Sequence, residues 1–221
     1  MISEFKKINE LFKEIDASLK TKVNFYVIGG AVLLYHKLKE ATKDVDIIVN
    51  SEEEFYAAEK AFRDLRFFTR IPTAEYVNVN LSQIFLRKDF RIDLFNRVVC
   101  KGFSLSDGMI KRSEKVFELN NLEAYLCSKE DILLFKTFTE REGDVQDCIK
   151  LAETGIKWDI ILKELKSQIK ISGNNVWITM VGERLHVLEE RGLNIPIMPQ
   201  IIELVEEYFD DFEKRMAEGS K

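Results

Sequence analysis

The chain has 221 residues, of which 46% are hydrophobic and 32% are charged, and its formal net charge is −5. This length accommodates one domain or a domain with a helical companion, and the composition is that of an ordinary soluble protein. The longest apolar runs, such as residues 45–49 and 132–135, are far shorter than the roughly 20 residues needed to cross a bilayer. We therefore expect a cytoplasmic protein without membrane contact.

Cysteine and histidine patterns argue against soft-metal chemistry. The three cysteines, Cys100, Cys127 and Cys148, include no CxxC pair, so neither a disulfide framework nor a zinc site is supported. The two histidines, His36 and His186, are too few and too far apart to build a metal site. We expect the cysteines to be reduced and buried.

Charge is unevenly distributed along the chain. Residues 60–115 contain twelve Lys or Arg against six Asp or Glu, whereas residues 183–221 contain five against ten. The basic segment would attract a polyanion such as RNA if the fold gathered its cations on one face. The alternative is a set of solvated strand and helix surfaces.

The first part of the chain alternates predicted helices and strands. In chain order we expect a helix over 8–19, a strand over 24–28, a helix over 31–38, a strand over 45–49, a helix over 51–62, strands over 76–81, 83–87 and 91–95, and a hairpin of 116–119 with 122–126. Ser51 followed by three Glu is a good helix start, because a hydroxyl caps free amides. Asn120-Asn121 tolerates the positive φ of a tight hairpin turn.

From residue 128 the pattern is helical. Helices are expected over 132–138, 144–152, 158–169, 176–190 and 200–216, in part from capping and Gly or Pro signals. The predicted elements thus form a small α/β half followed by an all-helical half. No repeat or long flexible linker is present, so we expect the two halves to pack together.

The most informative motif joins a glycine turn to a pair of acids. Gly29-Gly30 follows a strand, where glycines let the backbone come close to a phosphate, although such a pair alone is more often just a turn. If the next strand includes both Asp44 and Asp46, their side chains share a face about 6 to 7 Å apart. Carboxylates so close repel each other unless a cation compensates, and oxygen ligands suit Mg²⁺ or Mn²⁺.

Asp93 supplies a third acid on the apolar strand over 91–95. Three carboxylates on neighbouring strands can hold two metal ions about 3.5 to 4 Å apart, which activate a hydroxyl and neutralise a departing pyrophosphate. The alternative is that Asp93 pairs with a nearby cation such as Arg91 or Arg97.

The order of these three motifs resembles the nucleotidyltransferase superfamily whose catalytic core is shared with polymerase beta. The resemblance covers about residues 25–100. It implies an α+β fold, with a small mixed β-sheet core flanked by helices over 1–127 and a C-terminal helical domain over 128–221 that contributes to the nucleotide cleft. It also implies catalytic and metal-binding roles for Asp44, Asp46 and Asp93 with two Mg²⁺ or Mn²⁺ ions, and nucleotide binding by Gly29, Gly30, Thr42 and Lys43.

Residues 128–151 are similar to the helical segment of AbiEii-type and related nucleotidyltransferases, where a helix lysine precedes an Arg-x-x-Asp-x-x-Asp pattern. The matching positions are Lys136, Arg141, Asp144 and Asp147. The resemblance implies that Lys136 binds the triphosphate and that the other three support it. A solvated helix face or pairing with the helix dipole explains the two acids almost as well.

Together the resemblances imply transfer of a nucleoside monophosphate from an NTP to a hydroxyl on RNA, including tRNA, on a protein or on a small molecule. Gly30 replaces the serine common in polymerase-like members, which favours the GGxA branch found in toxin-like proteins. An antitoxin protein is then an expected partner. A recognisable tRNA-anchoring domain is lacking, which disfavours CCA addition. The alternative function is a catalytically silent, nucleotide-binding regulatory module of the same fold.

Overall fold

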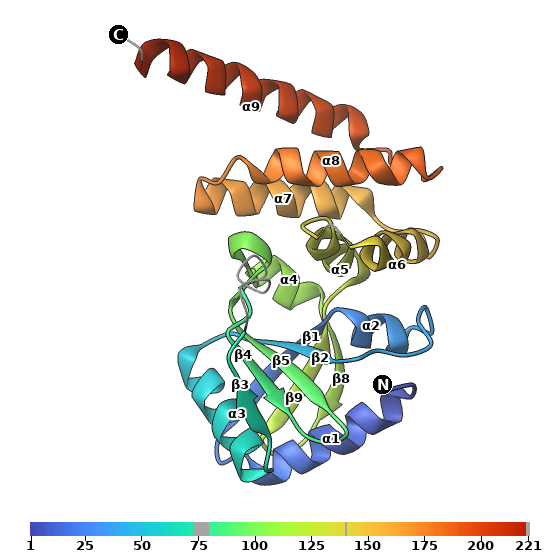
Figure 1. Cartoon of the computed structure of the whole chain (residues 1–221), viewed down its shortest axis with the longest axis vertical. Coiled ribbons are helices and arrows are strands. Elements are labelled where there is room, and N and C mark those ends of the chain that lie inside the picture. The colour runs from blue at the N-terminus through green and yellow to red at the C-terminus, as the bar shows by residue number, and fades with distance from the viewer. Residues whose placement is uncertain (73–79, 140, 220–221) are drawn as a thin grey trace. The chain divides into compact units, whose positions relative to one another are not determined.

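The computed structural model describes residues 1–72, 80–139 and 141–219 (Figure 1). The chain divides into two compact units, Met1–Ser128 and Lys129–Lys221. The first is α/β and the second is helical. Among the described helices, none combines the length and the apolar character that a bilayer span requires.

A mixed β-sheet forms the centre of the first unit. Within the described residues it has seven strands in the order β3-β4-β5-β2-β1-β9-β8. Their bounds are Val23–Ile28 (β1), Val45–Val49 (β2), Phe68–Arg70 (β3), Gln83–Leu86 (β4), Arg91–Asn96 (β5), Glu114–Glu118 (β8) and Leu122–Leu126 (β9). β1 runs antiparallel to β2 and parallel to β9, while β2 runs parallel to β5. The sheet confirms the predicted α+β class.

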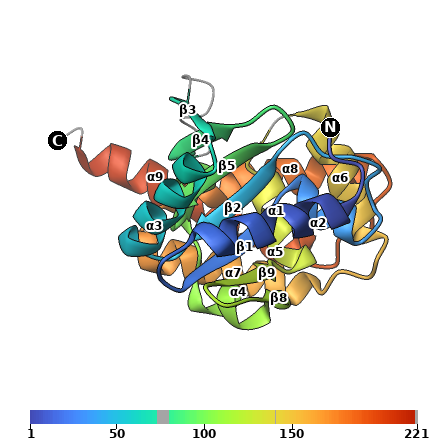
Figure 2. The ribbon, with the colours of Figure 1, turned by 90° about the horizontal axis from the view of Figure 1, so that it is seen from below.

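Helices pack against this sheet through aromatic side chains. The helices of the first unit are α1 (Phe5–Ser18), α2 (Gly30–Tyr35), α3 (Glu52–Asp64) and α4 (Asp107–Arg112). α1 and α3 lie across the sheet in Figure 2. The Phe25 ring of β1 is 5.9 Å from the ring of Phe12 in α1 and 6.1 Å from that of Phe62 in α3. Buried aromatic area of this kind dominates core energetics, so these contacts fix the two helices on the sheet.

The second unit consists of helices α5 (Lys129–Lys136), α6 (Glu142–Ala152), α7 (Trp158–Ser172), α8 (Trp177–Glu190) and α9 (Met198–Gly219). Its core includes the fully buried side chains of Trp177, Leu165 and Leu185. Gly182 of α8 lets the first turns of α9 approach closely, because a Cβ there would lie 3.2 Å from Val205 and 3.3 Å from Ile201.

Most expected elements are present, with differences at short segments. The Ser51 cap is confirmed, since the Glu54 amide donates to its hydroxyl at 3.2 Å. The short elements β3, α4, β6 (Val98–Val99) and β7 (Phe103–Ser104) were not predicted, because two to six residues carry little periodicity. Of the strand expected over 76–81, residues 76–79 lie outside the described residues and the last two are not in a strand.

The hairpin of β8 and β9 is confirmed, but its turn works differently from the expectation. Asn120 and Asn121 are both outside the positive-φ region. Instead, the Asn121 amide donates to the Asp16 carboxylate at 2.7 Å and its side chain donates to the Leu19 carbonyl at 3.1 Å. The turn is therefore held by α1. All three cysteines are buried thiols, as expected.

Candidate active site

Sheet register brings the predicted acids of the first unit together. β2 begins at Val45, so Asp44 directly precedes the strand and Asp46 is its second residue. Asp46 lies opposite Ile28 of β1 on one side and opposite Asp93 of β5 on the other. Neighbouring strands are about 4.8 Å apart, so the backbones that carry the two acids are adjacent.

The Gly29 turn leaves room for the Asp46 carboxylate. Gly29 has φ 67° and ψ −145°, a conformation that residues with a side chain rarely adopt. A Cβ at this position would lie 2.1 Å from Asp46 Oδ2, and one at Gly30 would lie 2.5 Å from Thr42 Oγ1. Both glycines therefore make room for neighbouring side chains of the site. α2 has only six residues, so its dipole contributes less here than a full helix would.

Replacing Gly29 by Ala is expected to displace the Asp46 carboxylate and to strain the turn. We expect a loss of stability of about 1–3 kcal/mol, measured by thermal unfolding, from the backbone strain. Nucleotide transfer should fall by more than the loss of folded protein explains. Gly143→Ala is the matched control, because a Cβ built there meets no described atom within 4 Å other than those of its chain neighbours and its own helix backbone. Full activity in Gly29→Ala would show that the position of Asp46 does not matter.

Thr42 shapes the backbone that leads to Asp44. Its side chain is buried, and its backbone exchanges two hydrogen bonds of 2.8 Å with Ile2. The Thr42 hydroxyl donates to the Asp44 carbonyl at 3.1 Å. Lys43 is exposed. Thr42 therefore has a structural role here, and nucleotide binding by Thr42 and Lys43 stays a prediction.

Asp93 is held by a two-pronged ion pair with Arg91. Arg91 Nε donates to Asp93 Oδ1 at 2.7 Å and its Nη2 donates to Oδ2 at 2.6 Å. The Asp93 side chain is only 5% exposed. Burial raises the pKa of Asp93, the Arg91 guanidinium opposes that rise, and the charge of Asp44 adds to it. The sequence left Arg91 and Arg97 as possible partners of Asp93, and Arg91 is the partner in the structure.

The donor set of these acids fits a hard metal ion in its chemistry. Asp44 lies close enough to Asp93 to raise its pKa, and the ligands are all carboxylate oxygens. Within the described ranges, however, no three His, Cys, Asp or Glu side chains are arranged to hold a metal. Both oxygens of Asp93 are bound by Arg91 in this conformation. Metal binding by Asp93 therefore has to compete with the guanidinium.

Arg91→Gln is expected to tighten Mn²⁺ binding about tenfold, because it removes a cation that competes for the same carboxylate. A titration followed by electron paramagnetic resonance measures this directly and needs no substrate. Arg63→Gln is the control, since Arg63 pairs with Glu59 on an exposed helix face. Weaker Mn²⁺ binding in Arg91→Gln would show instead that Arg91 organises the acids for the metal.

In the second unit, the predicted lysine and acids form one buried ion network. Lys136 Nζ donates to Asp144 Oδ1 at 2.6 Å and to Asp147 Oδ2 at 2.8 Å, and the Lys136 side chain is 10% exposed. Burial acts to lower the pKa of Lys136, but the two carboxylates outweigh it and raise the pKa. The Lys136 ammonium therefore keeps its positive charge, which the Asp144 and Asp147 carboxylates of the same unit balance.

Arg141 and a threonine complete this network at Asp144. Asp144 Oδ2 accepts from Arg141 Nε at 2.7 Å and from the Thr139 hydroxyl at 2.7 Å. Burial acts to raise the pKa of Asp144, and its cationic and hydroxyl partners together lower it to about 2. The structure thus brings together all four positions of the helical motif. Nucleotide binding by Lys136 stays a prediction.

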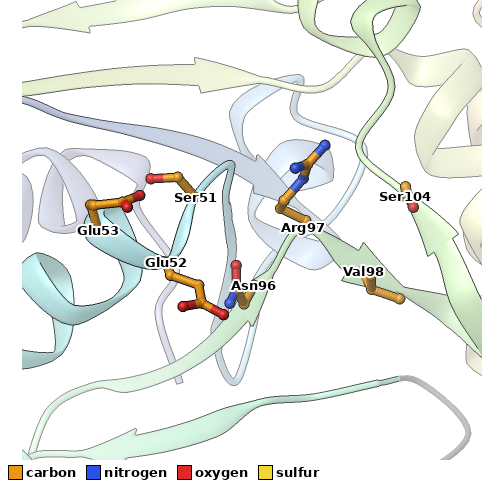
Figure 3. A pocket seen from close by; sticks show the side chains of 7 residues that line it. All are labelled: Ser51, Glu52, Glu53, Asn96, Arg97, Val98 and Ser104. Carbon is orange, nitrogen blue, oxygen red and sulfur yellow. The ribbon is translucent and has the colours of Figure 1, made fainter.

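A pocket that sequence reasoning missed lies at the carboxyl ends of β2 and β5. Its volume is about 570 Å³, and it is lined by Ser51, Glu52, Glu53, Asn96, Arg97, Val98 and Ser104. Figure 3 shows the two Glu carboxylates on one side and the Arg97 guanidinium on the other. Asp46 and Asp93 lie nearer the amino ends of the same strands. No predicted site residue lines the pocket, and no local motif signals it.

The mixed sheet sets the Gly29-Gly30 turn beside Asp46 and pairs the Asp46 strand with Asp93. This is the arrangement that the resemblance to nucleotidyltransferases predicts. The chain belongs to the family described as nucleotidyltransferase of unknown function (DUF6036), whose model matches residues 3–180. No curated protein matches the sequence. The match does not test the closeness to AbiEii-type proteins, which stays a prediction.

Solved structures of nucleotidyltransferases share the fold. A crystal structure of ANT(2″)-Ia in complex with adenylyl-2″-tobramycin has a TM-score of 0.53 and 8% identity, and the match covers 76% of this chain and 98% of that chain. A solution structure of the antibiotic-resistance factor ANT(2″)-Ia has a TM-score of 0.50 and 8% identity. This match covers 76% of this chain and 95% of that chain. At such low identity, the likeness shows the fold alone.

Proposed function

We propose that the protein transfers a nucleoside monophosphate from an NTP to a hydroxyl acceptor and releases pyrophosphate. The observation that carries this proposal is the register of Asp46 opposite Asp93, with Asp44 directly before the same strand. An apolar sheet has no structural need for acids at these positions. Membership of a nucleotidyltransferase family supports the same chemistry.

Asp44, Asp46 and Asp93 would hold Mg²⁺ or Mn²⁺, in the proposed two-ion arrangement. Bound there, the metal would neutralise charge on the triphosphate and lower the pKa of the acceptor hydroxyl. The buried Asp93, whose pKa is raised, is suited to accept a proton from that hydroxyl when Arg91 releases one of its oxygens. Gly29 keeps the Asp46 carboxylate against the turn.

The acceptor class is the least constrained part of the proposal. ANT(2″)-Ia was solved with an adenylylated small molecule. We therefore include small-molecule hydroxyls, together with RNA 3′ ends and protein hydroxyls, among the candidate acceptors. A toxin role would require growth arrest on expression, relieved by substitution of the catalytic acids. An antitoxin partner would follow only from that result.

The test is label transfer. Each of the four α-³²P-labelled NTPs is incubated with the protein, Mg²⁺ and, separately, total RNA, total protein or a set of polyhydroxylated small molecules. We expect label on one acceptor class, with pyrophosphate released in equal amount and both lost in EDTA. Label that appears without pyrophosphate release would contradict nucleotidyl transfer.

The second candidate is a catalytically silent nucleotide-binding module, which the occupation of both Asp93 oxygens by Arg91 favours. It predicts nucleotide binding by calorimetry with no pyrophosphate released for any NTP or acceptor. Turnover with any acceptor excludes it.

A further inference from the structure

The carboxyl-terminal helix α9 has an apolar stripe that its own unit leaves largely exposed. Ile202, Phe209, Phe212 and Met216 are 50%, 51%, 46% and 59% exposed. The first part of α9 packs on α8, where Ile201 is fully buried and both Ile201 and Val205 lie against Gly182. In Figure 1 the two helices diverge toward the end of α9. The segment matched by the family model ends at residue 180, so α9 lies outside it.

The stripe has the spacing of a helix-pairing seam. The apolar positions 202, 205, 209, 212 and 216 alternate steps of three and four residues. Val205 packs on α8 near Gly182, so the exposed members of this seam are Ile202, Phe209, Phe212 and Met216. This is the heptad pattern that places knobs of one helix into holes of another. The Tyr208 ring contacts the rings of Phe209 and Phe212 at centroid distances of 5.4 and 6.5 Å, so the aromatic side chains are partly ordered before any partner arrives.

Charge around the stripe decides the kind of partner. Glu203, Glu206, Glu207, Asp210, Asp211 and Glu213 lie on the same helix, against Lys214 and Arg215. With about 100° between successive residues, Glu206 and Glu213 follow directly along one edge of the stripe. A second copy of α9 would bring two acidic arrays together, which is unfavourable, whereas a basic helix would complement them.

We propose that α9 is a docking surface for a basic amphipathic helix of another protein. Apolar side chains of that helix would pack on Phe209 and Phe212, and its Lys or Arg side chains would face Glu206 and Glu213. This is the helix-in-groove mode of recognition, in which apolar contacts stabilise the complex and flanking charges select the partner.

The test uses the full chain and two synthetic peptides of three heptads. Both have Ile and Leu at the apolar positions, and the flanking positions are Lys in one peptide and Glu in the other. By fluorescence anisotropy we expect the Lys peptide to bind at least about tenfold more tightly than the Glu peptide, and more weakly as salt rises. Equal binding of both, or binding of neither, overturns the proposal.

Two variants locate the interaction. Phe209→Ser/Phe212→Ser should abolish Lys-peptide binding at unchanged thermal stability, since both side chains are exposed. Glu206→Lys/Glu213→Lys should reverse the preference toward the Glu peptide. Dimerisation of the unmodified chain in light scattering, lost in the Phe double variant, would assign the stripe to a second copy and overturn the proposal.

Discussion

The double variant Asp44→Asn/Asp46→Asn is expected to lower nucleotide transfer by at least about 1000-fold. Asn keeps the shape of each side chain but removes the charge that would hold a divalent metal. Metal ions contribute several kcal/mol to such transition states, and each 1.36 kcal/mol changes the rate tenfold. Initial rates of pyrophosphate release measure the loss.

Thermal stability separates this loss from misfolding. Because the acids of the site repel one another without a metal, the double variant should unfold at the same temperature as the unmodified chain or slightly above it. Asp159→Asn, an exposed partner of Lys163, is the control and should keep full activity. Transfer that continues unchanged in the double variant would rule out the proposed site.

Lys136→Met is expected to destabilise the helical unit by about 3–5 kcal/mol. Met is close to Lys in size, but it leaves Asp144 and Asp147 as buried carboxylates without their shared cation. Removing one partner of a buried ion network is far more costly than removing the whole network. The triple variant Lys136→Met/Asp144→Asn/Asp147→Asn should therefore recover part of the loss.

Urea unfolding followed by tryptophan fluorescence reports on this unit, because Trp158 and Trp177 are the two tryptophans of the chain. Lys163→Met is the control, since Lys163 is 79% exposed in its pair with Asp159. A Lys136→Met chain of unchanged stability that binds NTP more weakly would contradict this structural role. It would support the nucleotide contact predicted from the helical motif.

Local patterns in the sequence predicted the longer helices and strands, but not the short elements β3, α4, β6 and β7. The strand at Val45–Val49 and the charged pair Asp44 and Asp46 are visible in consecutive residues, because side chains alternate along a strand. The amphipathic helices follow from spacing in the same way. Local patterns could not show whether the basic segment, residues 60–115, forms a binding face for a polyanion. Whether its Lys and Arg side chains lie on one face depends on the fold.

Only the tertiary structure decided how distant residues meet. It placed Asp93 opposite Asp46, chose Arg91 as the partner of Asp93, put the Asp46 carboxylate against Gly29, and enclosed Lys136 between Asp144 and Asp147. Register, close approach and burial arise from contacts between segments far apart in the chain, and no local periodicity encodes them. For the same reason, the acidic carboxyl-terminal segment could be recognised from the sequence, but the exposure of its apolar stripe could not.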